Sequence, residues 1–497
     1  MKNSQKFFIL ATTFIVGAVI LTLEVLGFRL LAPYFGSSVY VSGSLISVIL
    51  AALSLGYYLG GVLADRNPKP HLPFLIILAA SGFLAVIYFS RNLLLEFFQG
   101  QSLIFGTLLS TFTIFAPPMT LLSMIPPFMI KLIANEKQLG TTAGQIFSVS
   151  TLGSILGSLL ATFIFIPHIG TSLTFIFCII LLTILASLGL WTWNKGFLLS
   201  NLLLPIFVIK PYFPAEPYLI HQGESPYNLV RIFETKGVRS MVLNRKGITQ
   251  SYIYLDNQTQ KNRRPNYRDL FLLGPVITPV KKVLMLGMSG GVGVKKLLSH
   301  YECEMDAVEI DPLVVKMAKN YFGVSASERL KIHITDARRY LFESKAQYDF
   351  IIIDLFQGGP DIPFYFTTKE FFTRVLNHLT PTGVVMMNVL GNFKNSKNSL
   401  IVEPVTNTFA DVFPTVFTLP LTYSTLVIAM KHKMTYPELT KKLSLIPNYL
   451  KALTSQSTDR LKMQSFDPTN PVITDDLAPI EQYTYAVLSN IVPKKPQ

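Results

Sequence analysis

Residues 281–298 read KKVLMLGMSGGVGVKKLL, and this stretch decides the fold of the C-terminal half of the chain. The apolar run up to Leu286 predicts a buried strand, and the glycine-rich turn Gly287–Gly293 leads into a segment of helical character. Glycines in such a turn let the backbone bend sharply and let a ligand approach the N-terminus of the following helix. The stretch is therefore typical of the first strand, turn and helix of a nucleotide-binding α/β domain.

Further apolar segments continue this pattern along the chain. They are residues 304–309, 330–334, 348–354 and 383–388, and the intervening stretches are long enough for helices. Near-continuous apolar strands with helical crossovers predict a mostly parallel, doubly wound sheet. Residues 415–419 and 424–431 are expected to close it as an antiparallel pair, and the alternating residues 224–260 predict a small antiparallel sheet before it.

Acidic residues end three of the predicted strands, at the edge where parallel sheets bind ligands. Glu309 follows Gly287 by 22 positions, where an acidic side chain accepts hydrogen bonds from both ribose hydroxyls. Asp336, followed by Ala337, is expected to meet an adenine edge, and Asp354 lies beside the same crevice. These residues, with Gly287 and Gly291, predict a nucleoside site; ordinary turn glycines and solvated carboxylates are the structural alternative.

The first 210 residues predict a different environment. Only 14% of the whole chain is charged, against roughly 25% in soluble proteins, and the N-terminal part carries few of those charges. About 20 apolar residues cross a bilayer, and six stretches reach that length: 7–31, 39–63, 73–90, 102–130, 143–166 and 172–193. A further run, Phe197–Ile209, is short and contains Pro205, so it is expected to lie in the interface or to re-enter. The sequence predicts a polytopic transmembrane α-helical bundle over residues 1–210.

The basic residues of this half lie in alternate loops. With a cytoplasmic N-terminus, most fall on the cytoplasmic side: Lys2, Lys6, Arg66, Lys69, Lys131, Lys137 and Lys195. This bias predicts a multi-pass inner-membrane protein, in contact with the lipid bilayer, whose C-terminal half faces the cytoplasm. Because no basic block with interleaved aromatics occurs, the net charge of +14 does not indicate nucleic-acid binding. The two cysteines have no metal-ligand spacing, so no metal site is expected.

Several motifs of the C-terminal half resemble the spermidine synthase (polyamine aminopropyltransferase) family. They are Val308–Pro312, Asp336, Tyr348–Asp354, Thr368–Phe371 and Leu379–Gly383. The N-terminal helices and the tail Thr474–Glu481 resemble bacterial membrane-fused members. The resemblance implies an α/β Rossmann-like S-adenosylmethionine-methyltransferase fold preceded by a small antiparallel β-domain. The expected domains are the transmembrane bundle 1–210, the β-domain 215–275, the nucleotide-binding catalytic domain 276–435 and a C-terminal extension 436–497.

The resemblance also implies a chemistry. The co-substrate would be decarboxylated S-adenosylmethionine or S-adenosylmethionine, the acceptor a polyamine or other small amine, and the soluble half could form a homodimer. Gln250 would lie on the nucleotide side, Tyr227 and Tyr267 would line the nucleotide and amine pockets, and Asp354 would help to deprotonate the attacking amine.

This chain departs from the family pattern at two positions. Gly290 stands where the family carries an aspartate that contacts the aminopropyl end, and Gln357 stands where it carries a second aspartate for the diamine. Asp475 or Asp476 could supply the missing charge in the substrate site. Two alternatives remain open: methyl transfer from intact S-adenosylmethionine, and a transporter whose non-catalytic soluble half senses a nucleotide or a polyamine. The transporter alternative draws on Gly60–Arg66, which resembles a loop signature of major-facilitator transporters.

Overall fold

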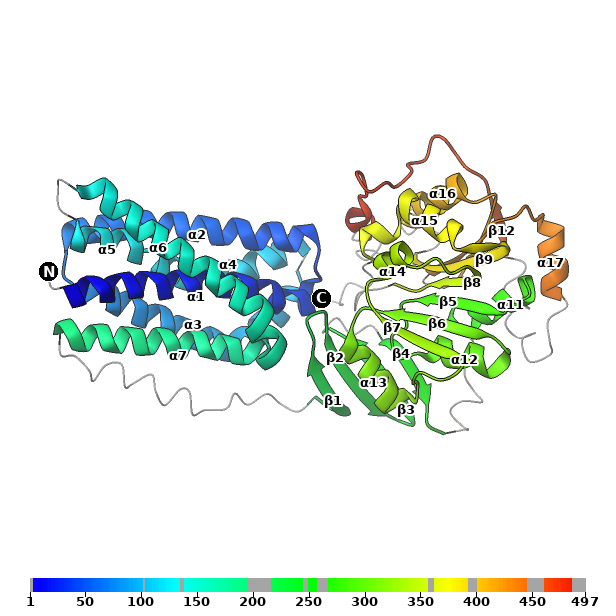
Figure 1. Ribbon diagram of the computed structural model, residues 1–497, viewed down its shortest axis with the longest axis horizontal. Coiled ribbons are helices and arrows are strands. Elements are labelled where there is room, and N and C mark those ends of the chain that lie inside the picture. Colours follow the sequence, from blue (N-terminus) through cyan, green and yellow to red (C-terminus); the bar gives the residue numbers. More distant parts are fainter. Residues whose placement is uncertain are drawn as a thin grey trace, which may run out of the picture. The chain divides into compact units, whose positions relative to one another are not determined.

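The computed structural model describes residues 3–101, 103–134, 138–194, 216–244, 249–256, 267–355, 362–391, 400–422, 424–444 and 460–484. The chain forms two compact units, Met1–Ala215 and Glu216–Gln497 (Figure 1). The predicted short segment Phe197–Ile209 lies outside the described residues.

The first unit is a bundle of long apolar helices. Its elements are α1 (Asn3–Phe35), α2 (Val39–Arg66), α3 (Leu72–Gln99), α4 (Leu103–Ser123), α5 (Ile125–Ile133), α6 (Leu139–Leu160), the π-helical turn η2 (Ala161–Phe165) and α7 (Ile166–Asn194). Five stretches of the described residues are long and apolar enough to cross a membrane: Asn3–Phe35, Val39–Arg66, Leu72–Gln99, Leu103–Ile133 and Leu139–Trp193.

The last two predicted spans, 143–166 and 172–193, lie within one apolar stretch of 55 residues. The helical path breaks at Gly170, whose φ of 81° and ψ of 169° lie outside the helical region. Figure 1 shows α6 and α7 as two separate legs on either side of this break, and both pack against α1.

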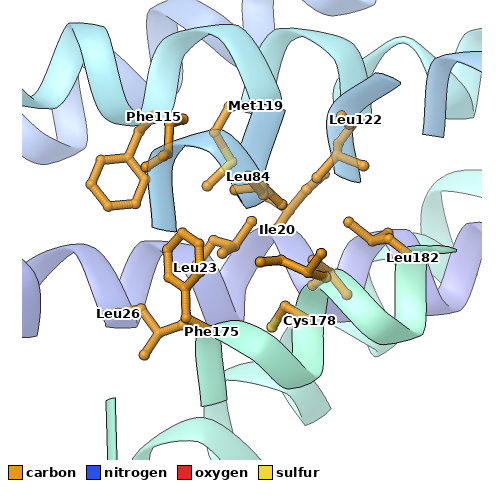
Figure 2. Close-up of a cluster of buried hydrophobic side chains, with 14 of the residues drawn as sticks. Ile20, Leu23, Leu26, Leu84, Phe115, Met119, Leu122, Phe175, Cys178 and Leu182 are labelled. Carbon is orange, nitrogen blue, oxygen red and sulfur yellow. The ribbon is translucent and has the colours of Figure 1, made fainter. Parts of the chain in front are cut away.

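Small residues and a large apolar core hold the bundle together. A Cβ added at Gly153 or Gly157 of α6 would come within 2.0 or 2.1 Å of a carbonyl oxygen of α1, so these glycines allow the two backbones to touch. Figure 2 shows part of the core: Ile20, Leu23 and Leu26 of α1, Leu84 of α3, Phe115, Met119 and Leu122 of α4, and Phe175, Cys178 and Leu182 of α7.

The second unit begins with a small antiparallel sheet in the order β1-β2-β3-β4. These strands are β1 (Leu219–Glu224), β2 (Leu229–Thr235), β3 (Val238–Leu243) and β4 (Thr249–Tyr254). The short segments α10 (Tyr267–Leu270), η4 (Phe271–Leu273) and α11 (Gly274–Ile277) then lead into the main sheet.

The main sheet has eight strands in the order β12-β10-β11-β9-β8-β5-β6-β7. Its elements are β5 (Lys282–Leu286), α12 (Val292–His300), β6 (Glu304–Glu309), α13 (Pro312–Phe322), β7 (Leu330–Ile334), α14 (Ala337–Glu343), β8 (Tyr348–Ile353), η5 (Phe364–Phe366), α15 (Lys369–Asn377), β9 (Leu379–Leu390), α16 (Val402–Val412), β10 (Thr415–Pro420), β11 (Ser424–Met430), α17 (Tyr436–Ser444) and β12 (Lys462–Gln464). Strands β9, β8, β5, β6 and β7 are parallel, and beyond β9 the strands β11, β10 and β12 each pair antiparallel with the strand before them. The predicted doubly wound sheet and the small sheet before it are confirmed.

Both faces of the main sheet are covered by helices, as near-continuous apolar strands require. Helices α12, α13 and α17 share one apolar core with the sheet, and α14, α15 and α16 share the other (Figure 1). Because the helices cover the two faces of the sheet, the carboxyl edge of the parallel strands is formed by the residues that follow each strand in the chain.

Candidate active site

The glycine-rich turn after β5 is packed too tightly for side chains at two positions. Gly287 has a φ of 86°, and a Cβ there would lie 2.3 Å from the carbonyl oxygen of Asp354. Gly291 has a φ of 70°, and its Cβ would lie 2.7 Å from a methyl group of Val324. Since both the backbone angle and the space favour glycine, this turn joins the end of β8 closely to the start of α12.

Gly290 is closed to a side chain by the small sheet. Its N–H donates to the hydroxyl of Ser251 on β4 at 3.0 Å, and an added Cβ would lie 2.7 Å from the Cβ of Ser251. Ser251 is itself buried. The position at which the resemblance expects an aspartate therefore has no room for one while Ser251 is present.

Glu309, the last residue of β6, connects the glycine-rich turn to the start of α13. Its carboxylate accepts the N–H of Ser289 at 2.8 Å and the N–H of Asp311 at 3.2 Å. Burial raises the pKa of Glu309 to about 6, although these backbone hydrogen bonds oppose the shift. Each carboxylate oxygen accepts one bond here and has capacity for another, which suits the hydroxyls of a ribose.

Asp311 lies within the motif Val308–Pro312, but the sequence assigned it no role. It is fully buried, caps α13 through the N–H of Leu313 at 2.9 Å, and accepts from Ser225 at 2.6 Å and Asn228 at 3.0 Å. The turn between β1 and β2 is thereby fixed beside the end of β6. Tyr227 belongs to this turn and is 48% exposed, so its ring is available to a ligand.

Asp336 caps α14. One carboxylate oxygen accepts the N–H groups of Arg338 and Arg339 at 2.8 and 3.0 Å, and the other is 3.5 Å from the hydroxyl of Tyr365. Burial and the neighbouring carboxylate raise the pKa of Tyr365 to about 12, so it stays a neutral donor. Ala337 is buried behind this cap. Tyr365 was not predicted, because it lies in a short turn far from Asp336 in sequence.

Asp354 follows β8 and has an incomplete set of partners. One carboxylate oxygen accepts from the hydroxyl of Tyr267 at 3.1 Å, and the other is buried without a hydrogen-bond partner in the described part of the chain. Burial raises the pKa of this carboxyl, although the nearby Arg268 and the hydrogen bonds with Tyr267 and Asn388 act in the opposite direction.

Asn388 lies on the neighbouring strand. Since Ile353 of β8 pairs with Met387 of β9, the next residues along, Asp354 and Asn388, lie beside each other. The side-chain oxygen of Asn388 is also buried with no partner among the described residues. A ligand with several N–H donors and no acceptor, such as an ammonium group, would fit this pair of oxygens. The signal for Asn388 was a polar residue at the end of an apolar strand.

A buried arginine links three predicted residues. The guanidinium of Arg268 lies 4.6 Å from the centre of the Tyr267 ring and donates to the carbonyl oxygen of Gln250. The structure thus brings Gln250 and Tyr267 together near Asp354, while Arg268 itself was missed. Nothing in a single sequence marks one arginine as buried.

The remaining predicted residues lie elsewhere. Both carboxylate oxygens of Asp475 accept from Arg338, which holds the pKa of Asp475 below its usual range. Asp476 is exposed, and Gln357 lies outside the described residues. Among the residues that the structure describes, no group of three or more His, Cys, Asp or Glu side chains is arranged to hold a metal ion.

The doubly wound sheet, the glycine-rich turn and the acidic strand ends define the second unit as an α/β domain with a methyltransferase-like fold. Residues 273–442 match the model of the spermine/spermidine synthase domain.

The chain is also similar to individual proteins. The polyamine aminopropyltransferase of Vibrio vulnificus is 32% identical over 194 residues, covering 38% of this chain and 64% of that protein. The probable polyamine aminopropyl transferase of Bifidobacterium longum is 26% identical over 308 residues, covering 56% of this chain and 65% of that protein. The chain thus spans just under two thirds of the length of these relatives. The crystal structure of a probable spermidine synthase from Corynebacterium glutamicum aligns with a TM-score of 0.40 at 16% identity, over 51% of this chain and 96% of that one.

Proposed function

We propose that this protein is an aminopropyltransferase that moves an aminopropyl group from decarboxylated S-adenosylmethionine to a small amine. The observation that carries the proposal is Asp354. It is a carboxylate at the carboxyl edge of the sheet, hydrogen-bonded to Tyr267 through one oxygen and unpartnered, among the described residues, through the other. The spermine/spermidine synthase domain that contains it supports the same assignment.

The reaction needs little beyond position and a base. The sulfonium of the bound donor supplies an aminopropyl carbon that is open to displacement. A new N–C bond forms, the C–S bond breaks, and its electron pair stays on sulfur to leave a neutral thioether. The amine must be neutral to attack, so a carboxylate that takes its proton and orients its lone pair provides the catalysis besides proximity.

Asp354 has the properties of that base. Its raised pKa brings it closer to that of the group it deprotonates, and Tyr267 fixes the orientation of the carboxylate. The side-chain oxygen of Asn388 would hold a second hydrogen of the amine in the same place.

The donor nucleoside would bind along the same edge. In this proposal the carboxylate of Glu309 accepts both ribose hydroxyls, Asp336 and Ala337 face the adenine, and Gly287 and Gly291 let the nucleoside approach the backbone. Gln250 and Tyr227 would close the pocket from the small sheet, with Tyr267 between the nucleoside and the amine.

One observation favours a second candidate function, methyl transfer from intact S-adenosylmethionine. Gly290 has no room for an acidic side chain against Ser251, so the turn offers no carboxylate to select a donor that ends in an amine. In that case the same nucleoside contacts would serve, and Asp354 would deprotonate the methyl acceptor.

The apolar helices of the first unit would anchor the enzyme in a membrane. Five stretches are long and apolar enough, and the last of them is interrupted at Gly170, so six crossings are proposed with both ends of the bundle in the cytoplasm. A periplasmic alkaline phosphatase reporter fused after Lys210 should be inactive. Full activity of that fusion would contradict the six-crossing topology.

The transfer assay tests the proposal directly. Full-length protein in detergent is incubated with decarboxylated or intact S-adenosylmethionine and a panel of small amines, and products are identified by mass spectrometry. The proposal expects an amine that gains one aminopropyl group from the decarboxylated donor. A product that gains only a methyl group would establish the second candidate, and binding without any transfer would favour a sensor.

A further inference from the structure

The C-terminal tail motif Thr474–Glu481 has no role in the chemistry described so far, yet it is held closely against the α/β unit. Its first anchor is buried: Ile473 donates its N–H to Thr408 of α16 at 3.0 Å, and its carbonyl oxygen accepts the N–H of Lys369 at 2.8 Å. Ile473 and Ile480 are themselves buried in the core beneath. The tail therefore lies as an ordered strap across the helices of one sheet face.

Near its start, at Asp475, the strap reaches the adenine side of the proposed nucleoside site. The N–H of Asp475 donates to Glu370 at 3.0 Å, and the carboxylate of Asp475 accepts from both terminal nitrogens of Arg338. A bidentate pair of this kind fixes direction as well as distance. Arg338 belongs to the first turn of α14, whose N-terminus is capped by Asp336.

Arg338 also contacts Tyr365, which lies beside Asp336. One terminal nitrogen lies 3.4 Å from the carbonyl oxygen of Tyr365, and the hydroxyl of Tyr365 lies 3.5 Å from Asp336. A chain of contacts thus runs from Asp475 through Arg338 and Tyr365 to Asp336. If the strap moved, Arg338 would lose its ion pair with Asp475. The contacts of Arg338 with Tyr365 and with the cap of α14 would then be less well ordered.

We propose that Arg338 and Asp475 form a latch that positions Asp336 and Tyr365 for the adenine of the donor. This inference rests on the proposed function, and it assigns Asp475 a positioning role in place of the amine contact that the sequence suggested. The ion pair is partly exposed, with side-chain exposures of 25% and 38%, so its effect on binding is modest and decreases with salt.

The test measures binding of 5′-methylthioadenosine to the full-length protein by calorimetry, because this nucleoside lacks the charged tail and reports only the adenosine contacts. Asp475→Asn and Arg338→Gln should each weaken binding about three- to tenfold. The charge exchange Arg338→Asp with Asp475→Arg should recover part of that loss. Glu343→Gln is the matched control, since it removes an ion pair with Arg339 on the same helix that does not touch the strap, and it should leave binding unchanged.

The latch would be overturned by wild-type affinity in Asp475→Asn, by an equal loss in Glu343→Gln, or by a wild-type protein that does not bind the nucleoside. A higher KM for the amine in Asp475→Asn, with nucleoside affinity unchanged, would also overturn it in favour of an amine contact. The transfer reaction itself can fail without affecting this comparison, because nucleoside binding is measured in the absence of turnover. Failure of the proposed function and failure of the latch are therefore distinguishable.

Discussion

Asp306 and Asp354 are two enclosed aspartates of the same sheet with opposite environments. Asp306, on β6, accepts from His333 at 2.8 Å and from Tyr348 at 2.9 Å, and Lys282 lies 3.5 Å away. Asp354, at the end of β8, accepts from Tyr267 at 3.1 Å and interacts with the side chain of Asn388, but one of its oxygens has no partner in the described part of the chain.

The pKa values of the two aspartates are shifted in opposite directions because their hydrogen bonding differs. Burial tends to raise both, but the hydrogen bonds to Asp306 outweigh it and hold that pKa below its usual range, whereas the pKa of Asp354 is raised. A buried carboxylate whose two oxygens both accept hydrogen bonds from the protein stabilises the fold. A buried carboxylate with an oxygen that lacks a donor can accept a hydrogen bond from a ligand.

The largest effect is expected from Asp354→Asn, which keeps the shape and removes the base. Turnover should fall by about 10²–10⁴, the usual contribution of a positioned base, while donor affinity changes little. Single-turnover rates and calorimetry on the same preparation measure the two quantities. Transfer at the wild-type rate would remove Asp354 from the mechanism, and Asp306→Asn serves as the control that should leave turnover intact.

A smaller loss is expected from Glu309→Ala, which removes the proposed bonds to the ribose. Donor binding should weaken by about 1.5–3 kcal/mol, the range for hydrogen bonds to charged groups. Unchanged affinity would mean that Glu309 only connects the glycine-rich turn to α13.

The pKa of Glu309 adds a pH dependence to binding. Ribose hydroxyls donate to the charged carboxylate, so binding lowers a pKa that stands at about 6 in the free protein. Affinity should therefore increase as the pH rises through about 6, with a proton released on binding near that pH. Calorimetry in buffers of different ionisation enthalpy measures the release, and Glu309→Ala should abolish it.

A carboxylate introduced into the glycine-rich turn would test where the tail of the donor lies. Gly290→Asp alone should disturb the packing, because its Cβ would lie 2.7 Å from the Cβ of Ser251. The double variant with Ser251→Gly provides the space. It should favour the decarboxylated donor over the intact one by about tenfold more than wild type does, since a carboxylate attracts an amine and repels a carboxylate. An unchanged ratio would show that the donor tail lies elsewhere.

Much of this arrangement follows from the sequence. Apolar runs predicted the parallel strands, and because parallel strands end on one edge, Glu309, Asp336 and Asp354 could be assigned to the same side of the sheet. The glycine-rich turn was recognisable because it follows the first predicted strand. The structure explains two of its glycines, since the backbone angles and close contacts at Gly287 and Gly291 require glycine.

The features that were missed depend on contacts between distant segments. Arg268 is buried against Tyr267, Asn388 stands beside Asp354, and Asp475 binds Arg338, and none of these pairings leaves a periodic signal. The break at Gly170 between the last two predicted spans was also not located from the sequence, because hydropathy does not show where a helix changes direction. Position on a strand is thus predictable, whereas partners across the core are not.

Hydrogen exchange of the three full-length proteins, wild type, Asp306→Asn and Asp354→Asn, tests the comparison most directly, because it needs no substrate. Peptides that cover β6 and β8 report the local stability of the strands around both aspartates. The account predicts faster exchange in Asp306→Asn, since removing its charge weakens bonds from His333 and Tyr348, and exchange equal to or slower than wild type in Asp354→Asn. Equally accelerated exchange in both variants would show that Asp354 is a structural residue and would contradict its assignment as the catalytic base.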